Sequence, residues 1–170
     1  MSRSVRSFLP VSGSPDELWE AFAADPTRWL PDARRAGPES CLMTVRAGQL
    51  SRVVEARVGP PWRTGSSIWR SMSWEPSSDA RDGVPLERLL PSFDGEIGLH
   101  AIRGVATLVV DAQYRVPGGP LGEALDAAAL QRVARGTIDR LLADVASRLT
   151  AESLLAIPEP VSTPEEHRVS

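Results

Sequence analysis

The chain has 170 residues, of which 42% are hydrophobic and 24% are charged, and its formal net charge is -3. These values are typical of one globular domain, and so mild a charge gives no reason to expect a nucleic-acid partner. No apolar run is long enough to span a membrane, and the N-terminal residues lack the apolar core of a signal peptide. The cytoplasm is therefore the expected compartment.

Two residue types limit the available chemistry. Cys41 is the single cysteine, which excludes a disulfide framework and a metal site built from several cysteines. It lies in the apolar run CLMTV, where a buried and inert thiol is expected. Lysine is absent, so neither Schiff-base chemistry nor a lysine general base is available.

The first predicted elements are a strand and a short helix. Residues 4–11 are partly β-branched and end at a Ser-Gly turn, as a strand does. Ser14 is followed by Pro15 and by Glu17, a pattern typical of a helix N-terminus with a capping box. Pro26 ends this helix just before it.

A second helical turn and a second tryptophan follow the first helix closely. Asp25 is placed to cap this turn. Trp29 is expected to fold back against the first helix or the edge of a sheet, and Trp19 lies on the apolar side of that helix. Both tryptophans are therefore interpreted as packing residues rather than ligand-binding ones.

Residues 40–115 follow mainly a strand pattern. The predicted strands are 41–47, 50–58, 64–75, 92–102 and 104–116. In the last strand the residues of one face are Ala106, Leu108, Val110, Ala112 and Tyr114, which predicts an antiparallel strand with one buried face. Residues 76–85 are predicted to form a flexible loop. Residues 85–90 are compatible with either a short strand or a helical turn.

A long helix is predicted from about Leu121 to Leu149. Its apolar residues recur with the helical period: Leu130, Val133, Ala134, Thr137, Ile138, Leu141, Leu142, Val145, Ala146 and Leu149. Gly136 interrupts the helix, at a cost of about 1 kcal/mol relative to alanine. Two explanations remain open for this glycine, namely close packing against a strand and room for a ligand. The polar tail from Pro158 is expected to be disordered.

This order of elements, combined with several specific stretches, resembles a known family. The stretches are the DPTRW continuation of the first helix, VGPPWRTG, SWEP, LLPSFDGEIGLHAI and YRVPGGPLGEALD. Together they are similar to actinobacterial members of the SRPBCC superfamily, also called START-like or polyketide cyclase/dehydrase-like. The resemblance covers residues 5–149.

The resemblance implies an α+β helix-grip fold, in which a curved antiparallel sheet of about six or seven strands wraps around the long C-terminal helix. Residues 1–157 would form this single domain, and residues 158–170 a disordered tail. The two short helices would close one end of the sheet. Many family members hold an apolar cavity between sheet and helix, and such cavities bind lipids, polyketides, hormones or other small apolar molecules. Some are enzymes, some are carriers and some bind proteins, so the fold does not determine function.

The titratable residues give little support for catalysis. His100 is predicted to lie on the outer face of its strand, and Glu55 and Asp111 are predicted to form cross-strand pairs at the surface. Ligand spacing for a metal is absent, as are phosphate-loop, dinucleotide and nucleophile motifs. Neither a metal nor a cofactor is therefore expected.

The candidate ligand site consists of side chains predicted to face the cavity. The candidates are Met72, Trp74, Leu99, Val110, Tyr114 and Thr137. The Tyr114 hydroxyl would need a partner in an apolar interior, so it is placed to orient a ligand. Met72 offers adaptable apolar surface. Trp74 resembles a family position that is usually structural, so Met72 and Tyr114 are the preferred candidates.

The expected function is the binding of a small apolar molecule, such as a lipid or a polyketide, in the cavity and without catalysis. One alternative is an enzyme of the polyketide cyclase/dehydratase type, a lyase or isomerase that uses a tyrosine or carboxylate in the cavity. The other alternative is a protein-interaction module. We expect no nucleic-acid partner and no membrane span, and the oligomeric state is open between monomer and homodimer.

Overall fold

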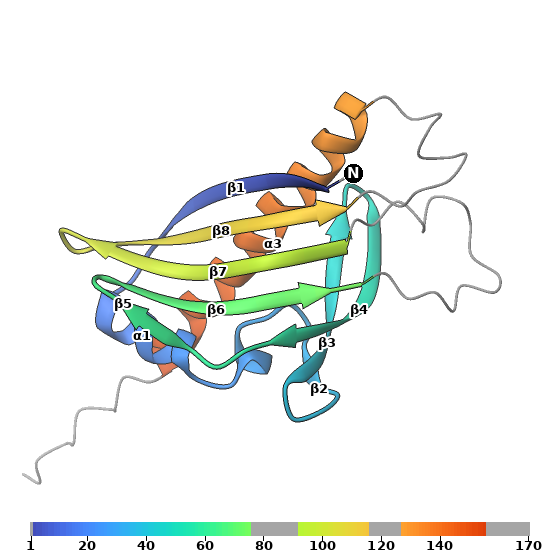
Figure 1. The fold of residues 1–170 in the computed structure, drawn as a ribbon. Helices are drawn as coiled ribbons and strands as arrows, with labels where there is room; N and C mark the ends of the chain where they lie inside the picture. The colour runs from blue at the N-terminus through green and yellow to red at the C-terminus, as the bar shows by residue number, and fades with distance from the viewer. Residues whose placement is uncertain (1, 76–91, 116–126, 156–170) are drawn as a thin grey trace, which may run out of the picture.

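The computed structural model describes residues 2–75, 92–115 and 127–155, and it has the predicted α+β helix-grip architecture. A curved antiparallel sheet packs its concave face against a long C-terminal helix (Figure 1). The elements are β1 (Ser2–Val11), α1 (Pro15–Ala23), the 3-10 helix η1 (Pro26–Arg28), β2 (Arg34–Arg35), β3 (Ser40–Ala47), β4 (Leu50–Val58), β5 (Trp62–Thr64), β6 (Ser67–Trp74), β7 (Ser92–Ile102), β8 (Val105–Arg115) and α3 (Ala127–Leu155).

The predictions for residues 76–91 and for the tail lie outside the described residues. The division into a domain and a disordered tail therefore stays a prediction. None of the described helices is long and apolar enough to cross a membrane.

The described sheet has eight strands in the order β1-β8-β7-β6-β4-β3-β2, and β5 pairs with β6. β1 is thus one edge of this sheet. Two strands, β2 and β5, were not predicted from the sequence. They are two and three residues long and their side chains are exposed, so they carry no alternating pattern to detect.

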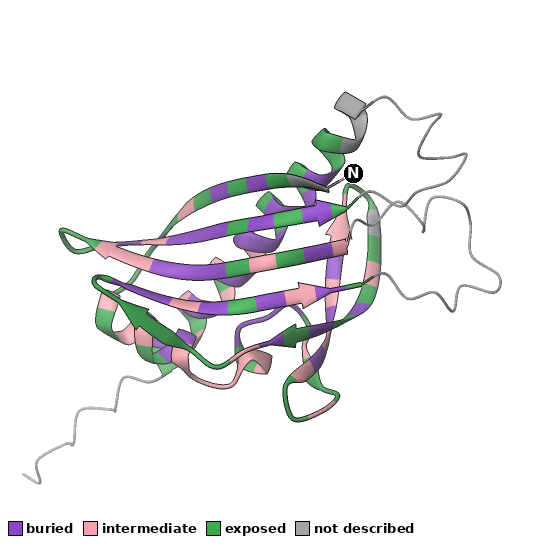
Figure 2. Cartoon of the chain, in the orientation of Figure 1, coloured by how far each residue is buried: buried purple, intermediate pink, exposed green. Residues whose placement is uncertain are grey.

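The long strands alternate between buried and exposed residues, as their sequence pattern predicted (Figure 2). The register of β6, β7 and β8 arranges the concave face in rows across the strands. From the C-terminal end of β8 inward, these rows are Trp74–Phe93–Tyr114, Met72–Gly95–Ala112, Arg70–Ile97–Val110 and Ile68–Leu99–Leu108.

The two short helices form at the predicted positions in the chain, but the capping hydrogen bond predicted for the first one is not made. Ser14 is the N-cap residue of α1, but its side chain makes no capping hydrogen bond. The Asp25 carboxylate does cap η1, since it accepts a 3.0 Å hydrogen bond from the Thr27 backbone N–H. Trp29 is fully buried and stacks on Phe22 with ring centroids 4.9 Å apart, which confirms its packing role.

The helix α3 continues to Leu155, beyond the predicted end, while the predicted start at Leu121 lies outside the described residues. Its buried residues are Ala134, Thr137, Ile138, Leu141, Leu142, Val145, Leu149 and Ser153. Val133 does not belong to this stripe, contrary to the prediction, because 39% of it is exposed.

Two hydrogen bonds fix the direction of α3 along β1. The Ser7 hydroxyl donates to Asp139 Oδ1 at 2.5 Å, and the Thr150 hydroxyl donates to the Ser12 carbonyl at 3.1 Å. From Ser7 to Ser12 the extended chain advances by about 17 Å, and from Asp139 to Thr150 the helix advances by the same distance. Because both contacts are met in the same order along the two segments, β1 and α3 run side by side in the same direction. The first turns of α3 lie near the N-terminal end of β1 and extend past this edge of the sheet (Figure 1). The N-terminal end of β1 pairs with the C-terminal end of β8.

Gly136 lies on the outer side of α3, contrary to both explanations considered for it. The residue is exposed, and a Cβ atom added there would meet nothing within 4 Å. It neither packs closely against a strand nor leaves room in the helix–sheet interface.

Replacing Gly136 with alanine is therefore expected to stabilise the protein by about 1 kcal/mol, because the substitution removes backbone entropy and causes no clash. Urea denaturation followed by circular dichroism measures this change. An unchanged or lower free energy of unfolding would contradict the exposed position of Gly136.

Candidate functional site

Three aromatic side chains line one end of the concave face. Trp74 and Phe93 stack face to face, with centroids 4.2 Å apart and an interplanar angle of 5°. Tyr114 follows Phe93 in register on β8. All three residues are buried. We call Trp74, Phe93 and Tyr114 the aromatic row.

The Tyr114 hydroxyl is a buried polar group without a hydrogen-bond partner among the described residues. Leaving such a group unpaired costs on the order of 1–3 kcal/mol, and most buried polar atoms in folded proteins have a partner. In the described part of the chain the indole nitrogens of Trp19 and Trp29 also lack a partner, and the Tyr114 hydroxyl is the unpartnered atom that belongs to a strand of the sheet.

The row next to the aromatic row is built from small residues at its centre. A Cβ atom on Gly95 would overlap the backbone of Ala112, so only glycine fits where β7 and β8 approach here. On the facing helix, Ala134 and Thr137 are buried. The Thr137 hydroxyl donates to the Val133 carbonyl at 2.8 Å, so its proton is engaged within the helix.

All six predicted site residues are buried, but the structure does not bring them all together. Met72, Trp74 and Tyr114 lie in the first two rows of the concave face, and Val110 lies in the third. Leu99 is in the fourth row, beside Ile68 and Leu108, and so belongs to the core at the other end. Thr137 lies on the inner side of α3.

Arg70 is a residue of the concave face that the sequence analysis missed. It is only 5% exposed, and its guanidinium contacts the C-terminal end of α1. Its N–H groups donate to the carbonyl oxygens of Phe22 (3.2 Å), Ala23 (2.7 Å), Ala24 (2.8 Å) and Gly59 (2.9 Å). Three of these carbonyls end a helix and need donors, which the cation supplies. Burial lowers the pKa of Arg70.

A pocket of about 390 Å³ lies beside Arg70, between the end of α1 and the strands β3, β4 and β6. Asp25 and Arg35 form an ion pair at its rim. The hydrogen bond from the Thr27 amide holds the pKa of the Asp25 carboxyl below its usual range, and Arg35 adds to this effect. Cys41 also lines the pocket and is buried as predicted, and this burial raises the pKa of its thiol.

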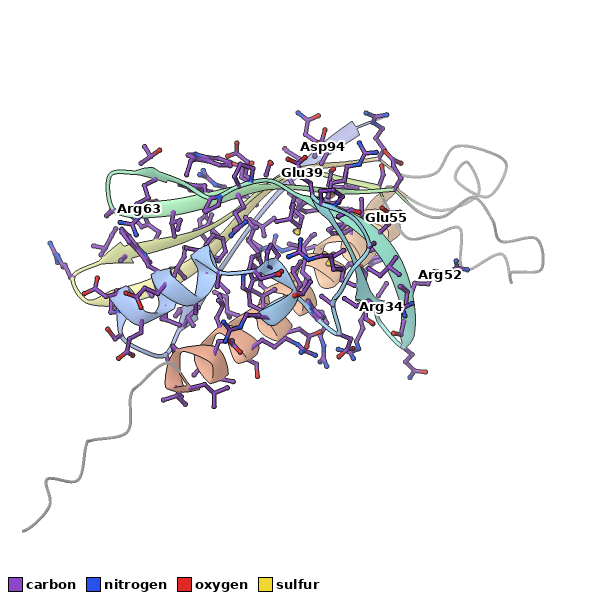
Figure 3. All side chains as sticks on the ribbon, turned by 90° about the horizontal axis from the view of Figure 1, so that it is seen from below. Arg34, Glu39, Arg52, Glu55, Arg63 and Asp94 are labelled. Atoms are coloured by element: carbon purple, nitrogen blue, oxygen red, sulfur yellow. The ribbon has the colours of Figure 1, made fainter. Side chains whose placement is uncertain are left out.

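The titratable residues of the strands lie mainly on the convex face, as predicted. The Ser67 hydroxyl and His100 Nδ1 share a hydrogen bond there. Asp111 is exposed and pairs with Arg6 across the strands at 3.4 Å. Glu55 is exposed, and Figure 3 shows Asp94 on the side of the sheet opposite α3. A polar hollow of about 690 Å³ lies at this face, where β4 separates from β6.

Comparisons with known proteins support the fold. No family model and no curated protein matches the sequence. Among solved structures, the chain is similar to the Zhui aromatase/cyclase from Streptomyces sp. R1128, with 12% identity, a TM-score of 0.59 and coverage of 91% of this chain and 94% of that one.

Two further structures have the same shape. The protein TTHA0849 from Thermus thermophilus has 13% identity and a TM-score of 0.56, and the match covers 88% of this chain and 98% of that one. A START superfamily protein from Mycobacterium smegmatis has 14% identity and a TM-score of 0.51, with coverage of 87% and 97%. The chain therefore has the same fold as these proteins, the helix-grip fold that the sequence resemblance implied.

Proposed function

We propose that the protein binds a small apolar molecule between the concave face of the sheet and α3, at the aromatic row. The observation that carries this proposal is the buried Tyr114 hydroxyl, which has no partner among the described residues. It lies beside a stacked pair of rings and beside the small residues Gly95 and Ala112. Ligand sites commonly combine an apolar lining with a few polar groups in this way.

The chemistry of the row favours a planar ligand that carries an oxygen. A flat ring can pack against the edge or face of the Trp74–Phe93 pair, and aromatic contacts of this kind contribute about 0.5–1.5 kcal/mol beyond burial. The Tyr114 hydroxyl can donate a hydrogen bond to a carbonyl or phenolic oxygen of the same molecule.

Binding without catalysis is favoured by the chemistry of the buried polar side chains. The buried polar and charged residues of the described chain are Ser7, Ser67, Arg70, Thr137 and Ser153, together with Tyr114. Neither a carboxylate nor a histidine is among them. General acid–base catalysis usually relies on such groups. Arg70 already donates to four backbone carbonyls.

A cyclase or dehydratase of the polyketide type is the second candidate. Two of the similar solved structures are described as aromatase/cyclases, the Zhui protein and the two-domain protein BexL. Tyr114 is the group that would act on a substrate in this case, as a hydrogen-bond donor to a carbonyl oxygen. Turnover of a supplied polyketide chain by the purified protein, and its loss in Tyr114→Phe, would favour this candidate.

The proposed site is tested with prodan, a fluorescent naphthalene ketone whose emission reports on polarity and hydrogen bonding. We expect one saturable site in the wild-type protein. Tyr114→Phe is expected to weaken binding about five-fold, the value of one hydrogen bond of about 1 kcal/mol, and to shift the bound emission to the blue. Fluorescence titration measures both effects.

The matched control is Ser73→Ala, which removes a hydroxyl next to Trp74 in the sequence but on the opposite face of the sheet. It is expected to leave both affinity and emission unchanged. Equal prodan binding by wild type and Tyr114→Phe would remove Tyr114 from the site. Native mass spectrometry of the freshly purified protein adds an independent test, since a co-purifying ligand would reveal its own chemical class.

A further inference from the structure

The outer face of the sheet carries a row of apolar residues across five strands. This is the face opposite α3, and Figures 1 and 3 show both α1 and α3 on the other side of the sheet. The pairing of β5, β6, β7, β8 and β1 places one residue of each strand in this row. We call the following residues the outer row: Trp62, Trp69, Gly98, Val109 and Phe8.

Both ends of the outer row are exposed to solvent. Phe8 is 59% exposed and Trp62 is 38% exposed. On the same face, Ile102 and Val105 pair at the β7–β8 hairpin, and each is more than half exposed. Exposed apolar patches bordered by polar residues commonly mark an interaction surface. The described residues therefore leave this part of the sheet available to a partner.

The centre of the outer row is flat. A Cβ atom on Gly98 would lie 2.3 Å from Cε3 of Trp69, so the indole ring of Trp69 lies against the Gly98 backbone. Covering a glycine in this way stabilises a sheet and accounts for the position of Trp69. It does not account for Trp62 and Phe8, which remain exposed at the two ends. The row thus offers a second molecule a flat apolar surface with an aromatic ring at each end.

Charged residues differ between the two sides of the outer row. The next row toward the end of β8 is Ser71, Glu96, Asp111 and Arg6. The next row toward the β7–β8 hairpin is Ser67, His100, Thr107 and Pro10. Arg6 pairs with Asp111 at 3.4 Å, whereas Glu96 forms no ion pair with another described residue. One side of the row therefore offers a carboxylate to a partner, and the other side offers an imidazole.

A second copy of the chain fits this face because the two sides of the outer row complement each other. A two-fold axis that lies along the outer row places the row of one copy on the same row of the other. The aromatic rings at each end then meet their own counterparts. The strands of the two sheets are aligned with each other, as in the common packing of one sheet on another.

The same axis pairs the charged groups. Glu96 and His100 lie equally far from Gly98 along β7, so the carboxylate of each copy meets the imidazole of the other. His100 Nδ1 is engaged with Ser67, which leaves Nε2 for this contact. A two-fold axis along the strands would instead bring carboxylates of the two copies together, and like charges in contact oppose association. Charge thus selects the axis along the outer row.

We propose that the protein forms a homodimer through its outer sheet face, in which the two outer rows are in contact and Glu96 of each copy pairs with His100 of the other. The patch spans five strands and, along β7, residues 96–102, which is about 400 Å² per copy. A stable complex buries about 800 Å² per partner, so this dimer forms and dissociates readily. The proposed ligand site lies on the concave face, and the dimer does not depend on it.

Sedimentation velocity of the full chain, from micromolar to millimolar concentration, tests the dimer. We expect a reversible shift from monomer to dimer in the wild type. Phe8→Ser and Trp62→Ser are each expected to weaken association about ten-fold or more, because a few aromatic residues carry most of the binding energy of an interface. The matched control is Val53→Ser, which replaces an exposed apolar residue of β4 outside the outer row and is expected to leave association unchanged.

Two charge variants test the orientation of the two copies. Glu96→Lys removes the carboxylate that meets the imidazole, and His100→Glu brings two carboxylates together. Each variant alone is expected to associate several-fold more weakly than the wild type. An equimolar mixture of the two places an ammonium group against a carboxylate at one contact and restores the original pair at the other. The mixture is therefore expected to associate more strongly than either variant alone.

Three results would each overturn the proposal. They are a monomer at every concentration, association that Phe8→Ser and Trp62→Ser leave unchanged, and a mixture of the charge variants that associates no more strongly than its components. Circular dichroism shows whether each variant is folded. If the wild type stays monomeric and binds phosphatidylcholine vesicles, and Trp62→Ser abolishes this binding, the outer row contacts a membrane and not a second copy.

Discussion

Replacing Arg70 with alanine is expected to lower the free energy of unfolding by about 3 kcal/mol or more. The substitution removes the donors for the carbonyls of Phe22, Ala23 and Ala24 at the end of α1. A buried polar group that loses its partner costs about 1–3 kcal/mol, and a cavity in the core adds to the loss. Urea denaturation of the two proteins measures the difference.

The control for this prediction is Arg57→Ala, which removes an exposed arginine from the neighbouring strand β4. Surface substitutions of this kind usually change stability by about 0.5 kcal/mol or less. Arg70→Lys keeps the positive charge but offers fewer hydrogen-bond donors in a different geometry. Its free energy of unfolding is therefore expected to lie between those of the wild type and Arg70→Ala. Equal stabilities of Arg70→Ala and Arg57→Ala would show that Arg70 does not hold α1 in place.

Enlarging Ala112 to tryptophan is expected to abolish prodan binding while the protein remains folded. Ala112 lies beside Gly95 in the row next to the aromatic row, and Ala134 is buried on α3. If a ligand occupies this space, an indole ring will fill it instead. Fluorescence titration measures the loss of binding, and circular dichroism confirms that the fold is retained.

Gln113→Trp is the matched control, because it introduces the same side chain at the next position but on the exposed face of β8. It is expected to bind prodan as the wild type does. Unchanged binding by Ala112→Trp would place the site elsewhere. If Ala112→Trp fails to fold, Ala134→Leu narrows the same space from the helix side, and full binding by that variant would contradict the site.

The long strands could be predicted because their residues alternate over many positions. The predicted ranges 50–58 and 92–102 agree with β4 and β7 in the structure. A period of two also assigns each side chain to a face, and Tyr114 is buried on the face that was predicted to point inward. For β6 the alternation showed only that Met72 and Trp74 share a face opposite to Trp69, and in the structure Met72 and Trp74 are the buried ones. The strand β5 has three residues, and a pattern that short has no detectable period.

Arg70 shows what such a pattern cannot reveal. It shares its alternation with Met72 and Trp74, so the sequence did contain the signal that it faces inward. Its carbonyl partners in α1 lie 46 to 48 residues away along the chain. Only the tertiary structure brings this arginine to the end of that helix. The helix carbonyls that accept its hydrogen bonds explain why a cation is tolerated in the core.

Gly136 shows the opposite case, in which the sequence was sufficient but was interpreted too coarsely. With 3.6 residues per turn, position 136 is rotated by about 200° from Ala134, which faces the sheet. The helical period alone therefore assigns Gly136 to the outer side, as the structure has it. The unpartnered hydroxyl of Tyr114, by contrast, depends on three-dimensional neighbours that no periodicity supplies.

The position of β1 at the edge of the sheet has a consequence for how copies of the protein behave at high concentration. In the described part of the chain, this edge strand of ten residues presents backbone N–H and C=O groups to which another chain can add, and such addition is a common start of aggregation. Pro10 lacks an N–H group, and Arg6 adds an exposed charge on the same strand. Both features work against edge-to-edge growth, so replacing them would favour self-assembly into extended sheets.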